Sequence, residues 1–342
     1  MRKCLIALLC AALPLLVACS GGDPFNPSSG VKYNGYRFTT YTTPADVRAI
    51  AGNASYLFAG TGSGLYLGNP TTTEPGFARV TAAGFPIDAV TQSINALLLE
   101  ASGSLLIGTD NGLYRWNADG SIAAVNGFAG LKITALAEKK TSAEKILWVG
   151  LSDATAAKTI ARQKDDGAFS FYGKADGMTA SRTTMIYCDP DSTLTIACGT
   201  GDAAANGLFQ FAESSGFTRL TTPLGGGANF FTKKSDVWYA GGNGAGIVYK
   251  SGTNDWAQLA TGFTPFGMVD RVADVYRETW VPTNAGLMLY LDMGEPTTFN
   301  LANRLTINTC GDVEVAHGNV WIAHPASGTV NGGISRAVFT GE

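Results

Sequence analysis

Histidine, the side chain that most often moves protons near neutral pH, occurs only twice in these 342 residues, at His317 and His324. His317 precedes Gly318-Asn319, which is typical of an exposed hairpin turn. His324 follows a short apolar run, and we expect it on a surface loop. A lone histidine in a loop is more often a surface residue than a catalyst, so the histidines predict no catalytic residue.

Sequence motifs for nucleophilic, metal or phosphate chemistry are also missing. The chain has no Gly-x-Ser-x-Gly, HExxH or Walker-type sequence, and Cys188, Cys198 and Cys310 form no CxxC pair. The glycine-rich stretches 225–227 and 241–246 have no predicted helix after them that could present amides to a phosphate. We therefore predict no metal and no cofactor, and expect the three cysteines to be small buried residues.

Polar side chains recur at equivalent places beside short apolar runs, where they could bind a ligand or a partner. Because any solvated loop is polar, ordinary surface loops are the alternative interpretation. The candidate ligand-binding residues are Arg48, Asp110, Asn111, Asp153, Asp202, Asn243, Arg271, Asn284, Asp312 and His324. The start of the inner strand in the other repeats carries Asn95, Thr134, Thr184 and Asn229.

These residues are positioned by a repeat, which is clearest at Ser104–Trp116. There, two apolar runs flank Asn111-Gly112, which predicts a hairpin turn with positive φ at both residues. The pattern of three apolar residues and a small one recurs seven times, with spacings of 48, 42, 49, 41, 42 and 41 residues. Its last residues are Gly60, Gly108, Gly150, Gly199, Ala240, Pro282 and Ala323.

Each repeat predicts four strands in about 42 residues, the length of a propeller blade. The predicted fold is all-β: a seven-bladed β-propeller of four-stranded blades over residues 35–342. The last repeat ends after its third strand, and residues 35–41 form an unassigned strand with the phase of an outermost strand. We expect this strand to pair with Ile334–Phe339 and to close the ring. An N-terminal arm beside an incomplete repeat is the alternative.

Aromatic residues share one phase of the repeat, two positions before its last residue. This position holds Phe58, Leu106, Trp148, Ala197, Trp238, Trp280 and Trp321. We predict that these side chains pack between adjacent blades. A carbohydrate-stacking surface is the alternative interpretation.

The repeats resemble the propeller repeats of bacterial two-component-regulator sensor domains. The match is closest at residues 102–115, Ser-Gly-Ser-Leu-Leu-Ile-Gly-Thr-Asp-Asn-Gly-Leu-Tyr-Arg, and Phe171–Met178 is similar to the connection between repeats in that family. Those sensors carry two propellers, a transmembrane helix and a kinase. The resemblance therefore implies the fold and does not imply phosphotransfer.

The N-terminus predicts export and lipid attachment. Arg2 and Lys3 precede an apolar run that is too short to span a bilayer comfortably. The run ends in Leu-Val-Ala-Cys19, which resembles the lipobox of bacterial lipoproteins. The resemblance implies a signal peptide over residues 1–18, acylation of Cys19 and a membrane anchor. Residues 19–34 are rich in Gly, Ser and Pro and predict a flexible tether.

Charge and location narrow the class of partner. Without Arg2 and Lys3 the chain has 22 basic and 27 acidic residues, so nucleic acid is a disfavoured partner.

Ser20 follows the predicted lipid-carrying Cys19. Lipoproteins that are retained in the inner membrane tend to carry Asp at this position, so Ser20 resembles the residue of lipoproteins that move to the outer membrane.

The sequence favours a lipid-anchored binding or scaffold module of the bacterial cell envelope, with a protein or glycan partner. One alternative is a propeller enzyme of the lactonase, lyase or glycan-cleaving kind, with its site at the central mouth. Another is a ligand-sensing subunit.

Overall fold

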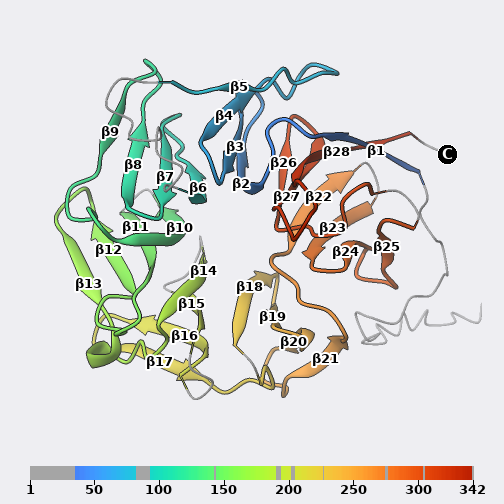
Figure 1. Ribbon diagram of the computed structural model, residues 1–342. Coiled ribbons are helices and arrows are strands. Elements are labelled where there is room, and N and C mark those ends of the chain that lie inside the picture. The colour runs from blue at the N-terminus through green and yellow to red at the C-terminus, as the bar shows by residue number, and fades with distance from the viewer. Residues whose placement is uncertain are drawn as a thin grey trace, which may run out of the picture.

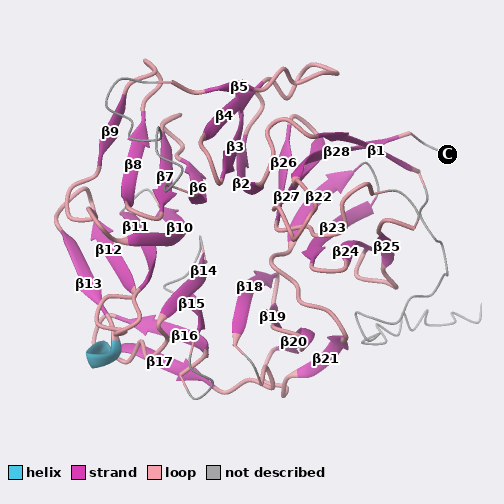
Figure 2. Cartoon of the chain, in the orientation of Figure 1, coloured by secondary structure: helices cyan, strands magenta, loops and turns pink. Residues whose placement is uncertain are grey.

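The structure is a computed structural model that describes residues 35–81, 93–141, 144–189, 194–201, 205–225, 227–273, 276–302 and 305–340. Nearly all regular elements in these ranges are strands, and one 3₁₀ helix, η1 (Lys174–Asp176), follows the strand β13 (Phe169–Tyr172). The strands form consecutive antiparallel meanders of four strands that pair in chain order, except that the first strand of the chain pairs with the last. The predicted all-β class is confirmed (Figure 2).

Five sheets contain four strands each, and we call each four-stranded group a unit, numbered along the chain. Unit one contains β2 (Val47–Gly52), β3 (Leu57–Thr61), β4 (Leu65–Gly68) and β5 (Ala78–Arg79). Unit two contains β6 (Ile94–Leu99), β7 (Leu105–Thr109), β8 (Gly112–Trp116) and β9 (Ile122–Ala124). Unit five contains β18 (Ala228–Lys234), β19 (Val237–Gly242), β20 (Gly246–Ser251) and β21 (Ala257–Ala260). Unit six contains β22 (Val269–Ala273), β23 (Tyr276–Thr283), β24 (Gly286–Leu291) and β25 (Thr297–Phe299).

The remaining four-stranded sheet, unit seven, joins the two ends of the described chain. It contains β26 (Asp312–Ala316), β27 (Asn319–His324), β28 (Gly333–Phe339) and β1 (Tyr36–Tyr41). Strand β1 pairs with β28 from Tyr36 opposite Phe339 to Tyr41 opposite Ile334. The N-terminal strand therefore has the partner that the sequence predicted.

The sixth sheet has eight strands and consists of two meanders. Unit three contains β10 (Lys132–Lys140), β11 (Lys145–Ser152), β12 (Ile160–Lys164) and β13 (Phe169–Tyr172). Unit four contains β14 (Arg182–Cys188), β15 (Thr195–Thr200), β16 (Gly207–Ala212) and β17 (Gly216–Leu220). Units three and four join where Ser152 of β11 pairs with Arg182 of β14.

The units stand side by side around a common middle (Figure 1). Strands β2, β6, β10, β14 and β18 lie toward that middle, and β5, β9, β13, β17 and β21 lie at the periphery. Seven buried apolar clusters fill the spaces between neighbouring units, one of them between units seven and one. Each sheet thus buries its two faces against two neighbours.

The hairpin between β7 and β8 differs from the predicted turn. Thr109 pairs with Gly112, so the two loop residues are Asp110 and Asn111. Neither loop residue has a positive φ, whereas Gly112 has a φ of 139°. The Thr109 hydroxyl accepts the Asn111 N–H (3.1 Å) and donates to the Gly112 carbonyl (2.9 Å). Thr61 and Thr283 close their hairpins through the same two bonds.

The predicted packing phase is wrong by one residue in units four and five. Inner strands of units one to five carry a bulge, after which Gly60, Gly108, Gly150, Cys198 and Gly241 occupy one structural position. The packing residue lies two positions before this one, so in units four and five it is Ile196 and Tyr239 instead of the predicted Ala197 and Trp238. Because a one-residue slip turns a side chain to the other face, Ile196 and Tyr239 pack toward the next unit, whereas Ala197 and half-buried Trp238 pack toward the previous one.

The other packing predictions hold with small shifts of boundary. Trp148, Trp280 and Trp321 are fully buried between adjacent units. The run Phe299–Leu301 favours an outer strand, and the structure has this strand, β25, at Thr297–Phe299. Within the described ranges, no helix is long and apolar enough to cross a membrane. The predicted signal peptide, Cys19 and the tether lie outside the described residues.

Candidate functional site

The polar residues at the starts of the inner strands serve as links between units. Asn95 donates to the Ile133 carbonyl (3.1 Å), Thr134 to the Thr183 carbonyl (2.5 Å) and Thr184 to the Ala228 carbonyl (2.8 Å). In the same way, Asn229 donates to the Pro265 carbonyl (3.2 Å). Each of these bonds joins one unit to the next, so a buried backbone acceptor is satisfied where two sheets meet.

We call the end of the sheets that carries the β3–β4 and β7–β8 hairpins the mouth. The residues predicted to line the mouth also make local contacts. Arg48 pairs with Asp46 (2.8 Å), and Asp110 pairs with Lys132 of unit three (2.7 Å). Burial of Asp110 would raise its pKa, but hydrogen bonds from Lys132 and Asn95 hold that pKa below its usual value.

The remaining loop candidates are held in separate turns. Asp153 accepts the backbone N–H groups of Thr155, Ala157 and Lys158, which lower its pKa against the effect of burial. Asn243 accepts a hydrogen bond from Asn229, and Asn284 accepts the Thr264 N–H. Asn111 is exposed, and Asp202 lies outside the described residues. Asp153, Asn243 and Asn284 are thus held by contacts in three separate turns.

Arg271 is the candidate that the sequence misplaced most. We expected Arg271 at the start of the inner strand of unit six. At the mouth end of this unit, however, Pro265 pairs with Thr283. Arg271 lies further along the strand, opposite Glu278. Its guanidinium donates to the Glu278 carboxylate (3.0 Å) and to the Tyr36 hydroxyl (2.7 Å). Tyr36 and Trp280 also donate to buried Glu278. Arg271 therefore helps to bind β1 to unit six.

His324 is fully buried, so the expected surface position is wrong. Its Nδ1 lies 2.9 Å from the Thr309 carbonyl, which can only accept, so Nδ1 carries the proton. Its Nε2 then accepts the Ser335 hydroxyl (2.7 Å), and Ser335 accepts Thr40 of β1 (2.8 Å). Burial lowers the pKa of His324 to about 4. A serine–histidine pair with no exposed surface ties β1 to β27 and β28, and substrate cannot reach it.

Asp312 and Glu314 lie on one face of β26 toward unit one, where Asp312 accepts the Ile50 N–H (3.0 Å). Burial raises the pKa of Asp312 to about 6. Burial, together with the nearby Asp312 carboxylate, raises the pKa of Glu314 to about 8. Among the described residues, no group of three or more His, Cys, Asp or Glu could hold a metal ion.

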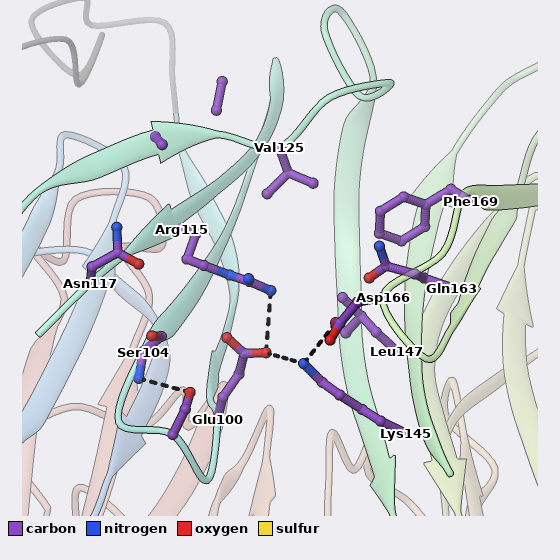
Figure 3. Close-up of a pocket in the computed structure, with 13 residues that line it drawn as sticks. Glu100, Ser104, Arg115, Asn117, Val125, Lys145, Leu147, Gln163, Asp166 and Phe169 are labelled. Atoms are coloured by element: carbon purple, nitrogen blue, oxygen red, sulfur yellow. Dashed lines mark hydrogen bonds and ion pairs between the residues drawn. The ribbon is translucent and has the colours of Figure 1, made fainter.

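A pocket of about 610 Å³ opens between units two and three, at the end of the sheets opposite the mouth. Its wall carries two cations and two carboxylates (Figure 3). Glu100 lies between Arg115 and Lys145, 3.3 Å from each, and Lys145 lies 3.2 Å from Asp166. Serine, amide and apolar side chains complete the lining, namely Ser102, Ser104, Asn117, Gln163, Ala123, Ala124, Val125, Leu147 and Phe169.

Sequence reasoning missed this pocket because its residues belong to two different repeats. Arg115 on β8 and Lys145 on β11 approach only when the units pack face to face. One available signal was Leu106, which stands where other repeats carry Trp. The pocket, and not the predicted mouth, is the candidate binding site.

The half-buried Glu314 and the fully buried His324 respond to pH in opposite directions. Folded Glu314 keeps its proton up to about pH 8, whereas the unfolded chain ionises from about pH 4.5, so Glu314 destabilises the fold as pH rises between these values. His324 destabilises the fold as pH falls from 6.5 toward 4.

Glu314→Gln should therefore leave stability nearly unchanged at pH 4.5 and raise it at pH 8, because glutamine stays neutral. We expect a gain on the order of 3 kcal/mol, allowing for the partial exposure of Glu314. Urea unfolding at several pH values measures it, with exposed Glu295→Gln as the control. An equal effect of Glu314→Gln at both pH values would contradict the assignment.

Comparisons with known proteins identify the fold and no family. No family model matches the chain, and no curated protein matches it. The extracellular domain of the one component system BT4673 of B. thetaiotaomicron has a similar structure, with a TM-score of 0.69 and 14% identity over 89% of this chain. The extracellular domain of the hybrid two component system BT3049 of the same organism gives 0.66 and 15% over 88%.

The chain spans only 40% and 42% of the length of these two domains. At this level of identity the likeness shows the fold alone. It confirms that this chain has the propeller-like, all-β fold of two-component sensor extracellular domains, as its repeats predicted.

Proposed function

We propose that this chain is a ligand-binding module of the bacterial cell envelope, built on a closed seven-bladed propeller. The observation that carries the proposal is the pocket between units two and three. It is preformed, lies where two sheets meet, and combines apolar walls with a few charged groups, as ligand sites usually do. The fold shared with sensor extracellular domains supports a binding role without specifying a ligand.

In this proposal the seven units are the blades, and β1 closes the ring. Support comes from the β1–β28 pairing and from two contacts of β1: Tyr36 with Glu278 of unit six, and Thr40 with Ser335 of unit seven. The apolar cluster between units seven and one, which includes Trp321 and Leu57, supports the same closure.

We also propose that acylated Cys19 holds the module at the membrane, most naturally the outer membrane, through the tether of residues 19–34. In this proposal an envelope protein or glycan contacts the loops of the mouth, a surface separate from the ligand pocket at the opposite end of the sheets. A rigid ring with loops from several units at one end suits such contact, and the scaffold and ligand-sensing roles are both compatible with it.

Closure predicts that β1 is essential for cooperative unfolding. A chain that starts at residue 42 should lose its single unfolding transition, because β28 gains a bare edge and Glu278 loses Tyr36. A chain that starts at residue 35 should keep it, and calorimetry compares the two. Equal stability of both chains would contradict the closure.

Lipid attachment predicts that labelled palmitate enters the wild-type chain in bacteria and not the Cys19→Ser variant. The variant should move from the membrane fraction to the soluble fraction. An exposed-surface variant, Ser170→Ala, serves as the labelling control. Palmitate on Cys19→Ser would contradict the assignment.

Binding in the pocket predicts that some small polar compound raises the melting temperature of the chain and not that of Ala123→Phe. Ala123 is exposed and lines the pocket, so phenylalanine there would fill the space. At a concentration of 100 Kd we expect a shift of about 5 °C.

The matched control is Ser170→Phe. Ser170 is also exposed and occupies the same place in unit three, opposite Arg162, as Ala123 does in unit two, opposite Arg115. A screen in which every stabilising compound also stabilises Ala123→Phe would overturn the pocket as the site.

A further inference from the structure

An arginine pairs with the packing residue of the middle strand in three units, at equivalent positions. Arg115 stands opposite Leu106 in unit two. Arg162 stands opposite Trp148 in unit three, and Arg336 stands opposite Trp321 in unit seven. The same cross-strand geometry therefore occurs with two kinds of neighbour.

Where the neighbour is tryptophan, the arginine lies over its ring. The guanidinium carbon of Arg162 is 5.5 Å from the centre of the Trp148 ring, and that of Arg336 is 5.6 Å from the Trp321 ring. These are cation–π distances. The Nε atoms of Arg115, Arg162 and Arg336 are all buried and lack a hydrogen-bond partner in the described part of the chain. The aromatic face gives Arg162 and Arg336 a cation–π partner, whereas Arg115 pairs with the Glu100 carboxylate.

In unit two this ring is missing. Leu106, which is shorter than tryptophan, is fully buried in the apolar cluster between units two and three, and the 610 Å³ pocket is lined by Arg115. The Arg115 side chain is 34% exposed, against 10% for Arg162. Arg115 thus faces the pocket without the indole that Arg162 and Arg336 have beside them.

The rest of the pocket wall indicates what an occupant would carry besides a ring. Phe169 and Leu147 offer an apolar wall. Lys145 and Arg115 could meet a carboxylate, and Asp166 and Glu100 could meet an amine. Asp166, whose side chain is 70% exposed, is the more accessible of the two carboxylates, because the Glu100 side chain is only 4% exposed.

We propose that the pocket binds a small zwitterionic aromatic molecule, whose ring lies against Arg115 in place of the missing tryptophan. The chemical class is that of a free aromatic amino acid. This inference rests on the proposed function, because it names the ligand class of the same pocket.

Calorimetric titration with L-tryptophan tests the proposal, with indole and L-alanine as probes for the ring alone and for the charged groups alone. We expect tryptophan to bind at least tenfold more tightly than either fragment. Leu106→Trp should abolish binding by rebuilding the stack of units three and seven. Because Leu106 is buried and its replacement could disturb folding, Ala123→Phe is the second filling variant, with the same expected loss.

Arg115→Met should weaken tryptophan binding about tenfold, since it keeps the bulk and removes the cation. Arg162→Met, its counterpart in unit three, lies outside the pocket and should leave binding unchanged. Equal losses in the two variants would overturn the role of Arg115.

The inference and the proposed function fail in different ways. If tryptophan does not bind but another compound stabilises the wild type and not Ala123→Phe, the pocket is a ligand site and the aromatic class is wrong. If tryptophan binds equally to the wild type, Leu106→Trp and Ala123→Phe, its site lies elsewhere and the proposed placement is wrong.

Discussion

Every sheet of this protein depends on its neighbours because a four-stranded meander of about 42 residues cannot bury its own two faces. Each unit places one apolar face against the unit before it and the other against the unit after it. The inner strands add a polar link at the bulge, from Asn95, Thr134, Thr184 or Asn229 to the backbone of the next unit. A backbone carbonyl that is buried between two sheets has no access to water and needs a hydrogen-bond donor. These amide and hydroxyl side chains donate to such carbonyls.

This dependence explains which parts of the structure the sequence predicted. Strand order and the partner of β1 follow from a repeat that is visible in the apolar pattern. The face to which each middle-strand side chain points was predicted correctly only in repeats without a shift. In unit four the sequence pattern ends at Gly199, but the equivalent structural position is Cys198, and this difference of one residue turns the side chains to the other face. The turn at Asp110-Asn111 was missed because a threonine hydroxyl, and not an Asn-Gly pair, satisfies its backbone.

The candidate site was harder to predict for a related reason. Polar residues beside an apolar run look alike in sequence whether they face solvent, a loop or the adjacent sheet. Arg271 and Asp312 bond to Tyr36 and Ile50, which lie far away in the chain, and His324 bonds to Ser335 on the adjacent strand. Only the packed units show which polar groups are already engaged. The pocket wall, by contrast, is formed by ordinary repeat positions from two units, and no single repeat contains it.

A departure from the repeat is therefore more informative than any one polar residue. In units three and seven, a tryptophan beneath an arginine completes the contact between sheets. In unit two the arginine stands opposite Leu106 instead of a tryptophan, and its side chain lines the pocket. Replacement of both residues by a matched apolar pair would have restored a dry contact, as core packing favours. The retained charge beside open space is what a binding site requires, and this contrast connects the repeat that builds the fold to the pocket that we assign to function.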